Sequence, residues 1–299
     1  MDKKMGILLT AISAACFGFL PIFASLAYRN GGNGVTLISI RFLSAAAIMW
    51  IIVLLKQKQY KLGKTKIIQL FMMGALGYVS TTGGYFSALN YISAPLVALL
   101  FYTNPIIVCV LSYVIFKEEI NINKAIALIL SVLGIIFIVG FSLGSIDIRG
   151  VLLAVLAAFL YSGYIIASGK LVTGLDPIVA ATYVASSCAV VTIAFGFITN
   201  SFVKINLPVF IYGFFMAVFS TVIAILFFFE GIKRIGASHA AIVSTIEPIV
   251  TVLMSALILG DRMSMPQLLG GALVVIGIVV LQRPVKKKDV SLEENSISE

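Results

Sequence analysis

The chain has 299 residues, of which 61% are hydrophobic and 11% charged, with a formal net charge of +9 and a mean hydropathy of +1.12. Soluble domains are about 45–50% apolar and about 25% charged, so this composition excludes a soluble globular protein and indicates that lipid is the main solvent. The basic residues lie in short loops between apolar runs and form no patch with interleaved aromatic residues, which argues against nucleic-acid binding.

The apolar runs have the length of membrane-spanning helices. A backbone inside a bilayer must satisfy its own hydrogen bonds, either as helices or as a closed barrel. A helix needs about 20 residues to cross the hydrocarbon core, whereas barrel strands alternate over about 10 residues. The sequence therefore predicts an all-α integral membrane protein with ten transmembrane helices, over residues 5–28, 35–55, 67–89, 95–116, 124–141, 149–169, 177–199, 208–230, 238–259 and 266–282.

The first apolar run imitates a secretory signal peptide, because Lys3 and Lys4 precede it. A cleavable apolar region is about 7–15 residues long. This run is longer and contains Pro21, so we expect it to remain as a transmembrane helix. The longest loop between the predicted helices, 56–66, is too short to form a soluble domain.

The distribution of positive charge predicts the orientation. Of the 21 lysines and arginines, sixteen fall on the side of the N-terminus, four fall on the opposite side, and Arg41 lies inside a predicted helix. Because positive residues favour the cytoplasmic side, both termini are expected to face the cytoplasm of a plasma-membrane protein. The polar tail 283–299 is expected to be a disordered cytoplasmic segment.

The second half of the chain repeats the first. Residues 86–139 align without a gap on 229–282 at an offset of 143, and residues 6–15 align on 150–159 at an offset of 144. The sequence thus divides into five-helix repeats over 5–141 and 149–282. An odd number of crossings inverts the second copy in the membrane, and inverted repeats that meet near the midplane are typical of alternating-access transporters.

Motifs for catalysis and for metal or cofactor binding are not recognisable in the sequence. Gly63-Lys64-Thr65 resembles the end of a phosphate-binding loop, but Lys58 occupies the place of its first glycine. His239 is the only histidine, and the three cysteines lie in separate apolar runs without metal spacing. We therefore expect no enzyme activity, no metal and no cofactor.

Ionisable residues inside predicted helices are the main candidates for a binding site, since a charge at the bilayer centre is costly unless it faces a partner or a wet cavity. Glu247 lies about nine residues into the helix 238–259, or about 14 Å along its axis, and Pro248 follows it. The repeat places Asn104-Pro105 at the equivalent point of 95–116. We expect two related kinks near the midplane, with Glu247 in a central cavity or paired structurally.

Arg41 is the second ionisable candidate, in the helix 35–55. It could pair with Glu247, bind an anionic or zwitterionic substrate through two hydrogen bonds, or extend outward to the membrane surface. Hydroxyl and aromatic residues near the two kinks complete the candidate substrate site: Tyr102, Thr103, Ser244, Thr245, Tyr85, Tyr161 and Tyr164. In contrast, Glu230 lies near Lys233 and Arg234 and is expected to form a local charge cluster.

The two repeated segments SAPLVALLFYTNPIIVCVLSYVIFKEEI (93–120) and GASHAAIVSTIEPIVTVLMSALILGDRM (236–263) resemble the EamA branch of the drug/metabolite transporter superfamily. Each has a helix start of small residues, a proline within the helix and an acidic residue at the far end. The resemblance extends over residues 5–282 and implies a ten-helix carrier with a central cavity. It also implies export of amino acids, other small metabolites or toxic analogues. The chain departs from exact repetition where Asn104 stands opposite Glu247, so any proton coupling would be asymmetric.

The expected function is therefore secondary transport of a small molecule across a lipid bilayer. A membrane channel or scaffold and, less favoured, a membrane-embedded enzyme are the alternatives that the sequence leaves open. Homodimer formation is also left open.

Overall fold

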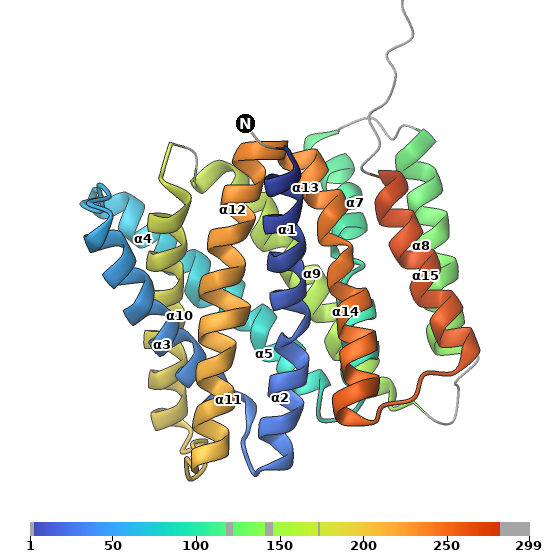
Figure 1. The fold of residues 1–299 in the computed structure, drawn as a ribbon, viewed down its shortest axis with the longest axis horizontal. Helices are drawn as coiled ribbons and strands as arrows, with labels where there is room; N and C mark the ends of the chain where they lie inside the picture. Colours follow the sequence, from blue (N-terminus) through green and yellow to red (C-terminus); the bar gives the residue numbers. More distant parts are fainter. Residues whose placement is uncertain (1–2, 118–121, 141–145, 173, 282–299) are drawn as a thin grey trace, which may run out of the picture.

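The computed structural model describes residues 3–117, 122–140, 146–172 and 174–281, and the described residues contain helices and no strands. The tail 283–299, for which we predict disorder, lies outside the described residues. The helices stand side by side in one bundle (Figure 1). The all-helical fold is thus confirmed for the described part of the chain.

The helices follow the predicted apolar runs. Those of the first half are α1 (Lys3–Gly18), α2 (Leu20–Arg29), α3 (Gly34–Leu55), α4 (Lys64–Met72), η1 (Met73–Tyr78), α5 (Val79–Ala88), α6 (Ala94–Phe101), α7 (Asn104–Phe116) and α8 (Ile122–Gly140). Those of the second half are α9 (Ile148–Leu171), α10 (Pro177–Ile198), α11 (Leu207–Ala217), η2 (Val218–Ile223), α12 (Ala224–Ile235), α13 (Ala237–Ser244), α14 (Ile246–Met254), η3 (Ser255–Leu259) and α15 (Met265–Leu281). The three η segments are π-helical turns, which occur often at functional sites.

Seven helical stretches among the described residues are long and apolar enough to cross a membrane. They are Lys3–Arg29, Gly34–Leu55, Ala94–Ile115, Ile148–Ser168, Pro177–Ile198, Leu207–Ile235 and Ile242–Leu259. Two shorter apolar helices lie at Ile122–Ile138 and Met265–Leu281. The remaining predicted span corresponds to the helical stretch 64–88, which contains the polar run Ser80-Thr81-Thr82.

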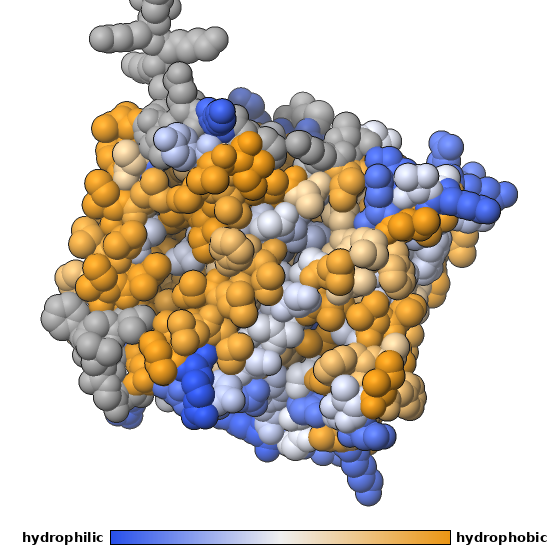
Figure 2. Space-filling view, turned by 180° about the vertical axis from the view of Figure 1, so that it is seen from behind, coloured by the Kyte–Doolittle hydropathy of each residue, from blue (hydrophilic) through white to orange (hydrophobic). Residues whose placement is uncertain are grey.

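The surface fits a bilayer. Figure 2 shows a broad apolar band across one face, with hydrophilic residues gathered toward its upper and lower ends. Large apolar side chains are exposed on the surface, among them Ile198, Leu257 and Leu207, which are 80%, 76% and 71% exposed. Contiguous apolar surface of this extent is typical of a protein embedded in lipid.

The ends of the helices are fixed by local hydrogen bonds. Asn33 caps α3 by accepting a hydrogen bond from the backbone N–H of Thr36, and Asn206 caps α11 in the same way through Val209. Such caps satisfy backbone donors that a helix leaves without partners. The Asn33 side chain also donates to the backbone oxygen of Ser201, which joins the start of α3 to the residues that follow α10.

Candidate functional site

Two helices are interrupted at equivalent points of the sequence repeat. Helix α6 ends at Phe101 and α7 begins at Asn104, while α13 ends at Ser244 and α14 begins at Ile246. Pro105 and Pro248 lie in the first turn of the second segment, where a missing backbone N–H costs least. The two predicted interruptions are therefore confirmed, while their position near the midplane stays a prediction.

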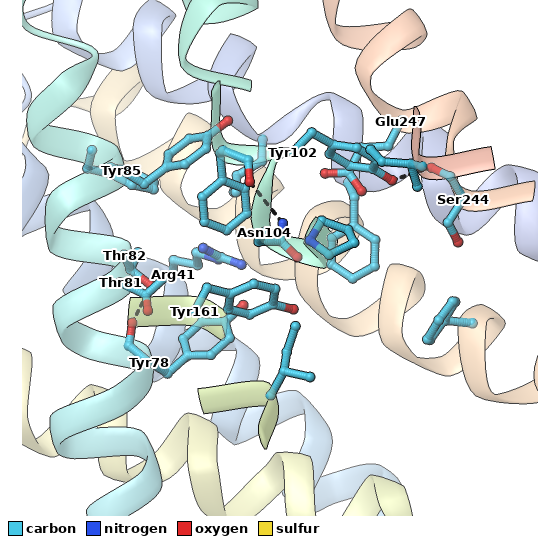
Figure 3. A pocket seen from close by; sticks show the side chains of 18 residues that line it. Arg41, Tyr78, Thr81, Thr82, Tyr85, Tyr102, Asn104, Tyr161, Ser244 and Glu247 are labelled. Atoms are coloured by element: carbon cyan, nitrogen blue, oxygen red, sulfur yellow. Dashed lines mark hydrogen bonds between the residues drawn. The ribbon is translucent and has the colours of Figure 1, made fainter. Parts of the chain in front are cut away.

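A cavity of about 330 Å³ lies between these interruptions. Its walls come from α1, α2, α3, η1, α5, α9, α12, α15 and the four segments next to the interruptions, and α5 contributes the most residues. The polar residues that line it are Arg41, Tyr78, Thr81, Thr82, Tyr85, Tyr102, Asn104, Tyr161, Ser244 and Glu247 (Figure 3). Phenylalanine side chains, including Phe101 and Phe228, line much of the rest. A space of this size accommodates a small organic molecule.

Arg41 enters the cavity wall from α3 and is only 2% exposed. Its Nε donates to the hydroxyl of Thr221 at 2.9 Å, and a terminal nitrogen donates to the backbone oxygen of Ser220 at 3.4 Å. The guanidinium also lies 4.9 Å from the centre of the Phe42 ring. These contacts compensate part of the cost of a buried cation and hold it in place. One of our three interpretations, in which the side chain extends outward to the membrane surface, is therefore wrong, because Arg41 is buried.

Glu247 lies on α14 and faces the cavity (Figure 3). Among the described residues, its carboxylate has no hydrogen bond or ion pair with a protein group, and Arg41 is not its partner. Its counterpart Asn104 donates from its side-chain amide to the backbone oxygen of Phe101 at 2.9 Å. One wall thus presents a carboxylate to the cavity and another presents a guanidinium, and the two do not neutralise each other directly.

One hydrogen bond joins the two interrupted helices. The hydroxyl of Tyr102 donates to the backbone oxygen of Ser244 at 2.6 Å (Figure 3). These residues stand 142 positions apart in the sequence. The kink in each helix makes this contact possible, because an interrupted helix leaves carbonyl groups without a partner from its own turn.

Aromatic rings form a continuous wall beside the charged groups. Tyr85 packs edge-on against Phe101 with centroids 5.1 Å apart, and Phe101 lies 5.2 Å from Tyr161. Tyr161 stacks on Tyr164 at 5.8 Å. Tyr78 contacts both of these tyrosines, at 6.3 and 5.4 Å respectively. The wall offers apolar contact together with hydroxyl groups that can orient a ligand.

Seven of the ten candidate residues from the sequence line the cavity, namely Arg41, Tyr85, Tyr102, Asn104, Tyr161, Ser244 and Glu247. Three do not. Thr103 and Thr245 bond the backbone oxygens of Leu100 and Ile242 in their own helices, and Tyr164 lies behind Tyr161. Tyr78, Thr81 and Thr82 also line the cavity and were not predicted from the sequence. The hydroxyl-rich run 80–82 inside an apolar stretch was the signal that could have found the two threonines.

Comparison with known proteins assigns the family. The model of the EamA-like transporter family matches residues 4–140 and 148–283. The uncharacterized transporter YcbK of Bacillus subtilis is 27% identical over 281 residues, which cover 90% of each chain. The uncharacterized transporter YyaM of the same organism is 26% identical over 270 residues, covering 86% of this chain and 87% of that one.

A solved crystal structure has the same fold. The two chains superpose with a TM-score of 0.64 at 17% sequence identity, over 94% of this chain and 98% of the other. The family match accounts for nearly the whole sequence, and the helices and apolar surface agree with a protein that crosses the bilayer several times. This chain is therefore a multi-pass membrane protein that belongs to the EamA-like transporter family.

Proposed function

We propose that this protein is a secondary transporter of the plasma membrane that exports amino acids or other small metabolites by alternating access through the central cavity. In this proposal the chain forms ten transmembrane helices in two inverted repeats, 5–141 and 149–282. The observation that carries the proposal is that equivalent residues of the two halves make equivalent contacts around the cavity.

The helices pack as expected for two halves related by a two-fold axis. Helix α1 of the first half packs against α12 and α14 of the second, and its counterpart α9 packs against α5 and α7 of the first. The equivalent helices α3 and α10 pack on each other, as do α8 and α15. Helices α3 and α10 run in opposite directions, because Lys58 after α3 pairs with Asp176 before α10 while Asn33 before α3 bonds Ser201 after α10.

Equivalent contacts between the two halves also occur at single residues beside the kinks. A methyl group on Gly18 would lie 2.8 Å from the backbone oxygen of Glu247. Ser162, which corresponds to Gly18 at an offset of 144, donates its hydroxyl to the backbone oxygen of Asn104 at 3.0 Å. Equivalent residues thus approach equivalent carbonyls. This supports a pseudo-symmetric site in which each half can open in turn.

The charges of the cavity support a dipolar substrate. Arg41 can bind a carboxylate and Glu247 an ammonium group, because neither is paired with the other in the described part of the chain. The aromatic wall adds apolar contact to a side chain. An amino acid carries all three of these features, and a cavity of about 330 Å³ has room for one.

Counterflow in liposomes tests the transport mechanism. Metabolite profiling of cells that overproduce or lack the protein supplies the candidate substrates. Liposomes containing the purified protein and a high internal concentration of unlabelled substrate are then expected to take up labelled substrate transiently above its external concentration, because a carrier exchanges ligand as it alternates. A channel would produce no such overshoot, and turnover of the substrate would identify an enzyme.

The proposed orientation has its own test. Single cysteines at Lys61 and Lys204, both exposed, can be introduced after Cys16, Cys109 and Cys188 have been replaced by alanine. A membrane-impermeant thiol reagent added to intact cells is expected to label position 204 and not position 61, because the positive loop 56–66 is placed in the cytoplasm. Labelling of position 61 from outside would contradict the orientation.

A further inference from the structure

A second cavity, of about 580 Å³, lies at one end of the bundle, away from the central site. It is formed where residues after α3 and before α10 face α12 and the start of α1. One part of its lining is apolar and includes Leu9, Ile178, Leu226 and Phe227. The other part is charged. The central cavity shares none of these residues.

The charged part carries more positive than negative groups. Lys56, Lys58, Lys233 and Arg234 line it together with only two carboxylates, those of Asp176 and Glu230. Lys58 pairs with Asp176 at 2.6 Å, and Glu230 lies 3.0 Å from Arg234 and 3.6 Å from Lys233. The four cations therefore exceed the two acids, and the cavity keeps a net positive charge.

Both carboxylates are paired with cations of the protein. Burial raises the pKa of Asp176, but hydrogen bonds from the Lys58 ammonium and the Ile178 backbone N–H outweigh this effect and leave that pKa below its ordinary value. Among the described residues Lys56 has no acidic partner, and 61% of the Lys233 side chain is exposed. The Lys56 ammonium is therefore available to an added anion, and the exposed Lys233, whose contact with Glu230 is 3.6 Å long, can reach the same anion.

We propose that this cavity binds an anionic phospholipid of the surrounding bilayer. Its phosphate would contact Lys56 and Lys233, and an acyl chain would lie along Leu9, Leu226 and Phe227. Basic pockets between transmembrane helices next to the membrane surface suit anionic headgroups in this way. A free inorganic anion would gain nothing from the apolar wall, whereas a phospholipid uses both parts of the lining.

The position of the cavity gives the lipid a role in joining helices. Lys56 follows α3, and Lys233 belongs to α12, so one phosphate would connect elements from the two halves of the chain. Ligands that bind only the folded protein raise its apparent stability by an amount that grows logarithmically with the ratio of the free ligand concentration to Kd. Binding of the lipid is therefore expected to raise the temperature at which the protein unfolds.

Lipid titration of the full-length protein in a neutral detergent tests the proposal. Phosphatidylglycerol is expected to raise the unfolding temperature and to remain bound in native mass spectrometry, while phosphatidylcholine with the same acyl chains is not. In the double variant Lys56→Gln/Lys233→Gln, the apparent affinity for phosphatidylglycerol should fall by about tenfold or more, since each cation near the surface contributes about a factor of five. The matched control Lys61→Gln/Lys204→Gln removes the same charge from exposed positions outside the cavity and should keep the affinity of the wild type.

Two further probes separate the lipid from its headgroup. Inorganic phosphate and glycerol 3-phosphate, tested alone, are expected to leave the unfolding temperature unchanged because they lack acyl chains. A rise in the unfolding temperature with either of them would mean that the ligand is a free anion and not a phospholipid. If the double variant and the wild type bind phosphatidylglycerol with equal affinity, the lipid does not bind at this cavity and the proposal is wrong. None of these measurements depends on transport, so their outcome is independent of the proposed function.

Discussion

Replacing Glu247 by glutamine is expected to abolish substrate accumulation driven by a pH gradient, while exchange of substrate across the membrane continues with a lower substrate affinity. The affinity falls because the amide oxygen still accepts a hydrogen bond from the ammonium group but carries no charge. Glu247 faces the cavity and its carboxylate has no protein partner among the described residues. A carboxyl can bind a proton on one side and release it on the other, whereas the glutamine amide of nearly the same size cannot. Accumulation and counterflow are measured in liposomes with and without an imposed pH gradient.

Glu230→Gln is the matched control. Glu230 lies in the same half of the chain but pairs with Lys233 and Arg234 at the end of α12, so its replacement should leave the response to pH intact. If Glu247→Gln accumulates substrate as the wild type does, Glu247 is not the coupling residue. If the variant fails to fold, the carboxyl has a structural role instead.

Replacing Gly270 by alanine is expected to destabilise the protein by about 1–3 kcal/mol, because the added methyl group has no free space. It would lie 2.6 Å from the backbone oxygen of Gly134 and 2.9 Å from the backbone nitrogen of Ile138. Backbone atoms cannot rotate away as a side chain could, so α8 and α15 would have to separate. Close helix contacts of this kind depend on small residues. Thermal unfolding in detergent measures the effect.

Gly163→Ala provides the comparison. A methyl group at Gly163 on α9 would meet nothing within 4 Å, and alanine favours a helix over glycine by up to about 1 kcal/mol. This variant should unfold at the temperature of the wild type or slightly above it. Equal unfolding temperatures for Gly270→Ala and Gly163→Ala would mean that the α8–α15 contact tolerates separation.

The apolar pattern located the helices well because lipid imposes a minimum length on each span. The predicted helix 95–116 matches α6 and α7 together, and the interruption between them was predicted from Pro105. The π-helical turns were not predictable from apolarity, since an extra residue in a turn leaves composition unchanged. One of them, η2, carries Ser220 and Thr221, which bind Arg41.

The site was predictable to the extent that polar residues are rare inside apolar helices. Glu247, Asn104 and Arg41 stood out for that reason, and all three line the cavity. Their contacts could not be read from the sequence. Arg41 lies 180 positions from Thr221, and no local pattern links residues so far apart. Thr103 and Thr245 were wrongly predicted to line the cavity. A threonine inside a helix can bond the backbone of its own helix, and its hydroxyl then points away from the site.

In the proposed alternating-access cycle, the bond between Tyr102 and Ser244 would favour one of the two open forms. Thr245 corresponds to Tyr102 in the repeat, but its hydroxyl bonds the backbone oxygen of Ile242 in its own helix, so this link across the halves has no counterpart within the described part of the chain. Two identical halves would make the inward-open and outward-open forms equal in free energy. A single hydrogen bond that only one form keeps contributes about 0.5–1.5 kcal/mol. In the proposed cycle that difference would bias the empty protein about 2- to 12-fold toward the form that keeps the bond, before any substrate or ion is bound.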